Sequence, residues 1–254
     1  MSTETIRLIE ELAANAWRPA IEQQLGGWRL RWTGGESRRV NSVWPNRLPA
    51  VKDLAQGIEQ VEDFYRLYNA IPRHQICPAA LPEDLPDRLA ERGYTAHAHT
   101  AVKIADIKDL LKLASPAKAE MTASPQLSET WFQTYTGASG YSSESLPIRL
   151  GILTRVEPTT HFVTLSLDGT PVAVGLGVVE RGWMGVFCVV TDPAHLRQGL
   201  ASGVMYALAE WGQAQGAEQV YLQVMNNNPP AIQLYERMGF EELYEYSYYE
   251  LRDA

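Results

Sequence analysis

The segment from Phe187 to Ala201 combines features that could bind a phosphate. A strand-like run ends at Thr191-Asp192-Pro193, and Arg197-Gln198-Gly199 then opens a helix. The first N–H groups of a helix lack intrahelical acceptors and carry the positive end of the helix dipole, so they favour an anion. Gly199 would let the backbone approach a ligand closely, and Arg197 would add charge-assisted hydrogen bonds. On its own, a glycine at a helix start is more often only a turn.

Other signatures of nucleotide or metal binding do not occur in the sequence. There is no GxxxxGK, which would predict a P-loop, and no GxGxxG, which would predict a dinucleotide site. The two cysteines, Cys77 and Cys188, lie far apart and belong to no CxxC pair. Zinc ribbons and disulfide frameworks are therefore excluded. We expect no metal.

Two runs in the second half resemble the signatures of the GNAT superfamily of CoA-dependent N-acyltransferases. VFCVVTDPAHLRQGLASGVMYAL is similar to its pyrophosphate-binding segment, which reads Gln or Arg, two residues, Gly, any residue, then Gly or Ala. VYLQVMNNNPPAIQLYERMGF is similar to its C-terminal signature, matched by Asn228, Ala231, Leu234, Tyr235, Gly239 and Phe240. Leu196 departs from the pattern, because it stands where the family has Gln or Arg.

The resemblance implies acetyl-CoA as co-substrate and a cofactor-binding site in residues 117–254. The end of the strand at 183–190 would pair with the pantetheine arm. The amides at the start of the helix near Leu200 would hold the pyrophosphate. Asn228 would both reach the arm and cap its helix. The residues implied are Val189, Val190, Thr191, Arg197, Gln198, Gly199, Leu200, Ala201, Ser202 and Asn228.

Tyr235 is the implied catalytic residue, lying near the thioester sulfur. A phenol with an ordinary pKa near ~10 is a reasonable proton donor to a departing thiolate. The alternative for Tyr235 is a core aromatic beside Leu234. Direct transfer to an amine is the implied route, whereas an acyl-enzyme on Cys188 is a second route. A strand cysteine is, however, usually just a small apolar residue.

The general base and the acceptor stay open. An attacking amine must be neutral, which calls for a carboxylate, a histidine or a water chain. Spacing does not distinguish between the candidates for the base, which are Glu180, His161, Glu144 and Glu245. Aromatic residues precede the sheet and either shape the acceptor pocket or pack in the core, namely Trp131, Tyr135 and Tyr141.

The distribution of charge along the sequence indicates which kinds of partner to expect. Residues 1–116 are neutral, so residues 117–254 hold the whole formal net charge of −8. Nucleic acid is not expected, because neither half carries a basic footprint. The acidic half is either ordinary solvated surface or an acidic cleft that favours a cationic amine, such as a polyamine, amino sugar, peptide N-terminus or Lys side chain.

The elements that must position these residues follow from the periodicity of the second half. Helices are expected near 130–135 and 146–156, followed by strands at 161–167, 171–179 and 183–190. A helix begins near Leu200, a strand covers 220–224, a helix follows Asn228, and a strand covers 244–251. The predicted fold class is α+β, a GNAT-like mixed and mostly antiparallel sheet flanked by helices.

The first half is interpreted as a second α/β domain, a degenerate GNAT-like or accessory domain over 1–116, with a boundary at Ser115-Pro116. Helices are expected over 4–24 and 54–67 and strands over 28–32, 39–44 and 100–105. The run LAERGY resembles LYERMGF but has Ala90 at the tyrosine position. An aromatic and basic cluster either faces the active site or pairs across strands: Trp28, Arg29, Arg31, Trp32, Arg38 and Arg39.

The sequence thus predicts an N-acetyltransferase that moves an acetyl group from acetyl-CoA to a primary amine of an unidentified acceptor by direct transfer. The alternative is a non-catalytic acyl-CoA-binding sensor or partner-binding module. No run approaches the ~18 apolar residues of a membrane helix and the first residues do not resemble a signal peptide, so a cytoplasmic location is expected. A homo-oligomer is an open option.

Overall fold

The computed structural model describes residues 2–113 and 119–252. In the first half, the elements are α1 (Thr3–Ala16), β1 (Ile21–Leu25), β2 (Trp28–Trp32), the 3-10 helix η1 (Arg38–Val40), β3 (Val43–Trp44), α2 (Leu54–Arg66), β4 (Arg73–Ile76), α3 (Leu85–Glu91), β5 (Thr95–Asp106) and α4 (Ile107–Leu110).

Two expectations for this half were wrong. The helix expected over 4–24 ends at Ala16, and 21–25 form strand β1. Pro19 explains the break, because proline lacks an N–H and disfavours helical geometry in the residue before it. The strand expected over 39–44 is reduced to Val43–Trp44. The Asn41 side chain accepts from the N–H groups of Thr33 (2.7 Å) and Gly35 (3.1 Å), so it replaces a strand ladder with a local turn.

The second half follows the predicted pattern, except that residues 120–124 form a strand that was not predicted. Its elements are β6 (Glu120–Ser124), α5 (Glu129–Ser139), α6 (Ser145–Thr154), β7 (Thr159–Leu167), β8 (Thr170–Glu180), β9 (Trp183–Thr191), the 3-10 helix η2 (Pro193–His195), α7 (Leu200–Ala214), β10 (Gln219–Met225), α8 (Pro229–Arg237) and β11 (Glu241–Glu250).

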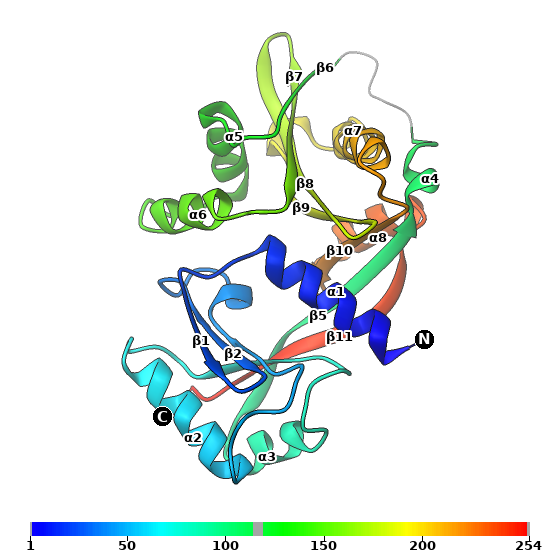
Figure 1. Ribbon diagram of the computed structural model, residues 1–254. Coiled ribbons are helices and arrows are strands. Elements are labelled where there is room, and N and C mark those ends of the chain that lie inside the picture. The colour runs from blue at the N-terminus through cyan, green and yellow to red at the C-terminus, as the bar shows by residue number, and fades with distance from the viewer. Residues whose placement is uncertain (1, 114–118, 253–254) are drawn as a thin grey trace.

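One mixed sheet joins both halves, in the order β1-β2-β3-β4-β11-β5-β10-β9-β8-β7-β6. Its neighbouring strands are antiparallel except for the pairs β3–β4 and β9–β10. The predicted fold class, an α+β mixed and mostly antiparallel sheet flanked by helices, is confirmed. In Figure 1, helices α5 and α6 lie on one side of the upper strands and α7 on the other.

The two halves exchange strands. β5, from the first half, pairs with β10 from Gln219↔Asp106 to Met225↔Thr100. β11, the end of the chain, pairs with β5 and, from Ser247↔Ile76 to Glu250↔Arg73, with β4. Figure 1 shows β5 and β11 running together between the two halves. The boundary expected at Ser115-Pro116 lies outside the described residues, so the division into 1–116 and 117–254 stays a prediction, and strand pairing crosses it.

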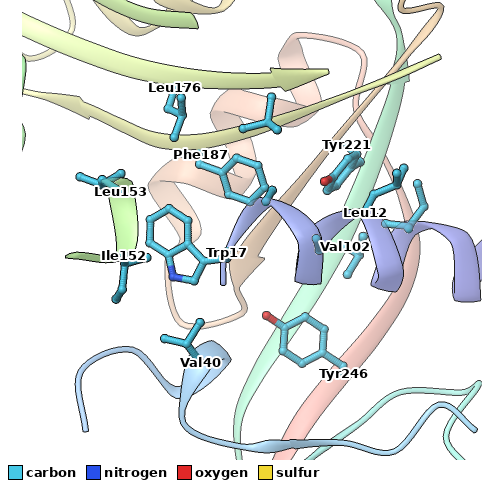
Figure 2. Packing of buried hydrophobic residues seen from close by; sticks show 14 of the residues in the cluster. Leu12, Trp17, Val40, Val102, Ile152, Leu153, Leu176, Phe187, Tyr221 and Tyr246 are labelled. Carbon is cyan, nitrogen blue, oxygen red and sulfur yellow. The ribbon is translucent and has the colours of Figure 1, made fainter. Parts of the chain in front are cut away.

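Helix α1 lies where the halves meet, and its buried face belongs to a core shared by both. Trp17, just after the helix, stacks on Phe187 of β9 with ring centroids 5.7 Å apart. Figure 2 shows this pair together with Tyr221 of β10 and Tyr246 of β11. Because residues from both halves fill one core, the two halves are fixed relative to each other.

Glu10 of α1 is a buried carboxyl in this region, and it is fully engaged. It accepts hydrogen bonds from Trp44 Nε1 (3.1 Å), Gln75 Nε2 (2.9 Å) and Tyr244 OH (2.7 Å). Burial raises the pKa of Glu10, and the hydrogen bond from Tyr244 partly offsets that rise. A buried polar group with several donors helps to specify how its elements pack. Glu10 therefore ties α1 to strands β3, β4 and β11.

Candidate functional site at the divergence of strands β9 and β10

The site begins where two parallel strands separate. β9 and β10 pair from Gln219↔Trp183 to Leu222↔Val186, and beyond that register β9 continues to Thr191 on β8 alone. Between the pairs Val174↔Val190 and Leu176↔Phe187, β9 holds one residue more than β8. The bulge therefore lies on β9, where Cys188 has a φ of +54°. A bulge turns a strand away from its neighbour. The β10-facing edge of β9 past Val186 is thus left open for a ligand backbone or amide to pair with it.

Gly175 and Trp131 hold this bulge in place. A Cβ at Gly175 would lie 2.4 Å from Val204 Cγ1, so only glycine lets helix α7 pack this closely. On the opposite side of the sheet, Trp131 is fully buried, and its Nε1 donates to the Gly175 carbonyl at 3.1 Å. Of the two roles considered for Trp131, the structure therefore favours the core.

A first cavity, of about 420 Å³, opens at the divergence. Val189 and Val190 of β9 line it, as predicted for the cofactor arm, and Tyr235 reaches it from α8. Tyr135 and Tyr141 also line it, their hydroxyls 3.1 Å apart. This cavity therefore combines the predicted catalytic residue with two of the aromatic residues for which an acceptor pocket and core packing were the alternatives.

A second cavity, of about 760 Å³, lies at the end of β9 between the start of α7 and helix α8. The predicted cofactor residues in its lining are Thr191, Arg197, Gly199, Leu200, Ala201 and Ser202. Gln198 and Asn228 line neither cavity. Asn228 accepts from the N–H of Ala231 at 3.3 Å, so its role as the cap of α8 is confirmed, while a contact to the cofactor stays a prediction.

The start of α7 has the geometry that a phosphate needs. Its N-cap, Gly199, has a φ of +78° and provides no capping side chain. By contrast, α1 and α5 are capped by the hydroxyls of Ser2 and Ser128. Apart from the adjoining stretch of chain, no atom lies within 4 Å of a Cβ built on Gly199, so a ligand has room beside the backbone. The first-turn amides of α7 are thus available to an anion, and Arg197 lies beside them.

Helix α8 lines both cavities. Leu234 lines the second cavity, while the Tyr235 ring lines the first and contacts the edge of Phe240, with centroids 5.7 Å apart. Burial raises the pKa of the Tyr235 phenol to about 12. The hydroxyl is therefore protonated throughout the physiological range and can donate a hydrogen bond to charge that develops on sulfur.

None of the four candidates for the general base lines either cavity. Glu180 accepts from Asn15 at 3.1 Å, and Glu245 pairs with His99 at 2.7 Å. His161 stacks on Trp211, where burial lowers its pKa, and Glu144 precedes α6.

Cys188 does line the first cavity, but its chemistry is unfavourable for an acyl-enzyme. Burial raises the pKa of its thiol to about 12, and the hydrogen bond with Tyr135 offsets only part of that rise. Because the thiolate is the nucleophile, a thiol with a raised pKa reacts poorly. Direct transfer is favoured on this ground.

The aromatic and basic cluster of the first half divides between two places. Arg38 and Arg39 line the first cavity, whereas Arg31 is buried and donates to Ser42 Oγ and Gln75 Oε1. The remaining members pack within the first half: Trp28 on His74, Arg29 on Trp44 and Trp32 on Tyr68.

Several cavity residues escaped the sequence reasoning, notably Trp17, Arg149, Tyr246 and Tyr248. Tyr244, Tyr246 and Tyr248 alternate along β11, and this period of two was the one available signal for a shared aromatic face. Trp17, just after α1, and Arg149 of α6 lie far apart in the sequence and carry no local signal.

Comparison with known proteins places the chain in a family. A family model described as "Probable histone acetyltransferase Rv0428c C-terminal" matches residues 3–249. The chain belongs to this acetyltransferase family. It is 28% identical over 248 residues to an uncharacterized N-acetyltransferase, YobR, of Bacillus subtilis (strain 168), covering 96% of this chain and 98% of that protein.

Solved structures agree on the fold. A GCN5-related N-acetyltransferase from Kribbella flavida matches with a TM-score of 0.72 at 17% identity. The match covers 100% of this chain and 96% of the Kribbella chain. A tandem GNAT protein from the clavulanic acid biosynthesis pathway has a TM-score of 0.66 at 12% identity, covering 96% and 87%. The predicted GNAT superfamily fold is confirmed, and the tandem arrangement fits both halves of this N-acetyltransferase.

No group of three or more His, Cys, Asp or Glu side chains is placed to hold a metal ion within 2–113 and 119–252. Over the same residues, no helix has both the length and the apolar character that crossing a bilayer requires.

Proposed function

We propose that this protein transfers the acetyl group of acetyl-CoA to a primary amine by direct attack of the amine on the thioester. The phosphates would lie at the amides that begin α7, and the arm would run along the open edge of β9 towards the first cavity. The acceptor would enter that cavity from the face where the first half packs against the sheet.

One arrangement carries the proposal: an uncapped helix start lines the cavity at the end of β9, and a half-buried tyrosine lines the cavity where β9 and β10 separate. Gly199 and its neighbours line the second cavity, and Tyr235 lines the first. Acetyl-CoA supplies an activated acyl group and a sulfur leaving group. The protein's own contributions are a fixed position for both substrates and a phenol that donates to the sulfur as negative charge develops there.

The second candidate is a non-catalytic acyl-CoA-binding module. It is favoured by the lining of the first cavity, which in the described residues contains no Asp, Glu or His to accept the amine proton. Release of CoA in the presence of an amine distinguishes the two, because a sensor binds acetyl-CoA without turning it over.

Calorimetric titration of acetyl-CoA tests the cofactor site. Gly199→Glu places a carboxylate against the phosphate position and should abolish micromolar binding. Gly169→Glu is the matched control: Gly169 has a φ of +77° and open surroundings like Gly199, but it lies in the turn between β7 and β8. Equal loss in both variants, or wild-type affinity in Gly199→Glu, would count against the site.

A further inference from the structure

The first cavity is lined by cationic side chains without anionic ones. Arg38 and Arg39 reach it from η1, and Arg149 reaches it from α6. Among the described residues of its lining there is no Asp or Glu. The net negative charge of the second half therefore does not extend to this surface.

The three arginines differ in how far they are neutralised. Arg149 pairs with Glu36 at 3.1 Å and lies 3.4 Å above the Tyr141 ring. Arg38 pairs with Glu250 at 2.7 Å, a carboxylate that it shares with other arginines.

Arg39 has no carboxylate partner in the described chain. Its guanidinium packs over the rings of Trp17 (5.7 Å) and Phe187 (5.8 Å), and its Nε has no hydrogen-bond partner. A partly buried guanidinium held against two rings keeps its charge, and a hydrogen bond with Tyr246 occupies part of its planar set of donors.

The unsatisfied polar atoms of the cavity lining point to the same kind of ligand. Four buried side-chain atoms there have no hydrogen-bond partner: Trp17 Nε1, Arg39 Nε, Arg149 Nε and Gln223 Nε2. All four are nitrogen donors. Buried donors are normally paired, so a lining rich in unpaired donors favours a ligand rich in oxygen acceptors.

The phosphates of acetyl-CoA do not account for these arginines. The uncapped start of α7 is in the second cavity, which has cations of its own in Arg197 and Arg237. The first cavity instead contains the predicted thioester end, at Val189, Val190 and Tyr235. Its charge is therefore available to the acceptor.

We infer that the acceptor carries an anionic carboxylate or phosphate group beside its amine, and that Arg39 binds this group. The inference rests on the proposed acetyl transfer. It reverses the preference for a cationic acceptor that the charge balance of the sequence favours. A guanidinium binds either oxyanion through paired N–H groups, so the two groups share one recognition chemistry.

The same charges help to prepare the nucleophile. A positive surrounding disfavours an ammonium ion and lowers the pKa of the amine, which supplies the neutral form where no carboxylate base is at hand. The amine nitrogen bonds to the acetyl carbon, and the carbon–sulfur bond breaks with its electron pair on sulfur. The proton lost from nitrogen balances the thiolate, so the products are an amide and a thiol.

The test uses the full chain and pairs of related amines, one member of which carries an anionic group. β-Alanine is compared with β-alaninamide, phosphoethanolamine with ethanolamine, and 1,2-diaminoethane serves as the cationic member, alongside L-amino acids and their amides. CoA release and the thermal shift produced by each amine are both measured. The anionic members should have a kcat/KM about tenfold or more above their neutral partners. The amine pair with the larger ratio of kcat/KM identifies the bound group as a carboxylate or a phosphate.

Arg39→Gln should remove most of this advantage, measured as the ratio of kcat/KM between the anionic and neutral members of each pair, and Arg39→Lys should restore part of it. Arg47→Gln, an exposed arginine away from the cavity, makes the same change in net charge and should have no effect. Thermal unfolding checks that each variant folds.

Each result decides a separate point. The inference would be overturned if neutral or cationic amines were used as well as the anionic ones. It would also be overturned if Arg39→Gln and Arg47→Gln had the same kcat/KM for the anionic amines. Either result leaves acetyl transfer standing. No CoA release from any amine, with a thermal shift by anionic members that Arg39→Gln abolishes, would overturn the proposed function and leave the anion site. Neither release nor an anion-dependent shift would overturn both.

Discussion

At the scale of single residues, Tyr235 shows how position changes an ordinary group. The sequence indicated a proton donor with a pKa near ~10. The structure places the phenol in a half-buried position at the strand divergence, where burial raises its pKa to about 12. The proton is held more tightly than in water, which keeps the hydroxyl a donor over the whole working range but makes full proton transfer to sulfur less favourable.

Removing this hydroxyl tests the role. Tyr235→Phe keeps the ring and should lower kcat by about a hundredfold or more, with the Kd for acetyl-CoA unchanged within about twofold. The readouts are steady-state kinetics and calorimetry. If Tyr235→Phe turned over acetyl-CoA at the wild-type rate, the tyrosine would be only a packing residue.

The pH dependence follows from the same shift. Rising pH removes the proton that Tyr235 must donate. Because its pKa is about 12, this loss occurs at a higher pH than in an unperturbed phenol, whose pKa is near ~10. Ionisation of Tyr235 should therefore not lower the wild-type rate near pH ~10. A fall in rate near pH ~10 that is present in the wild type and absent from Tyr235→Phe would contradict the raised pKa.

At the scale of elements, the end of β11 is held by charge. Glu250 is buried and accepts hydrogen bonds from Arg38, Arg73 and Arg252, each at 2.7 Å. Arg73 stands opposite Glu250 in the register of β4. Burial by itself raises the pKa of this carboxyl, but the hydrogen bonds of Arg38 and Arg252 and the charge of Arg73 outweigh it and lower the pKa to about 2.

This shift predicts acid sensitivity. A carboxyl whose pKa is lower in the folded state stabilises the fold above its unfolded pKa of ~4.3, and loses that contribution as the pH falls towards 2. Glu250→Gln should lower the free energy of unfolding at pH 7 by about 3 kcal/mol and flatten its dependence on pH below ~5. Urea unfolding at several pH values measures both, and the exposed Glu242→Gln on the same strand is the control. Equal loss in the two variants would refute the assignment.

At the scale of the whole molecule, the exchanged strands make the halves interdependent. Without residues 1–116, β10 would lose its partner β5 and β11 would lose both of its partners. The exposed strand edges and the divided core would favour aggregation. The first cavity would also lose Trp17, Arg38 and Arg39.

Splitting the chain between residues 116 and 117 tests this dependence. Each fragment alone should lack a cooperative unfolding transition, whereas the two fragments expressed together should associate and bind acetyl-CoA. Circular dichroism, thermal unfolding and calorimetry provide the readouts. A fragment 117–254 that folds and binds acetyl-CoA unaided would show that the exchange is dispensable.

The sequence by itself determined the features that are encoded by contiguous residues. The turn at Asp168-Gly169, the glycine before α7, the cap at Asn228 and the superfamily signatures depend on short-range backbone geometry, which local residue types largely fix. From these the GNAT fold of the second half followed.

Only the tertiary structure decided what surrounds the acceptor. Arg39, Arg149 and Trp17 come together because β5 and β11 cross between the halves and α1 packs in the shared core. Pairing between distant strands depends on burial summed over the whole chain, which leaves no local pattern to read. The net charge of the second half could not predict the cavity, because charge acts through position and the arginines that line it come mainly from the other half.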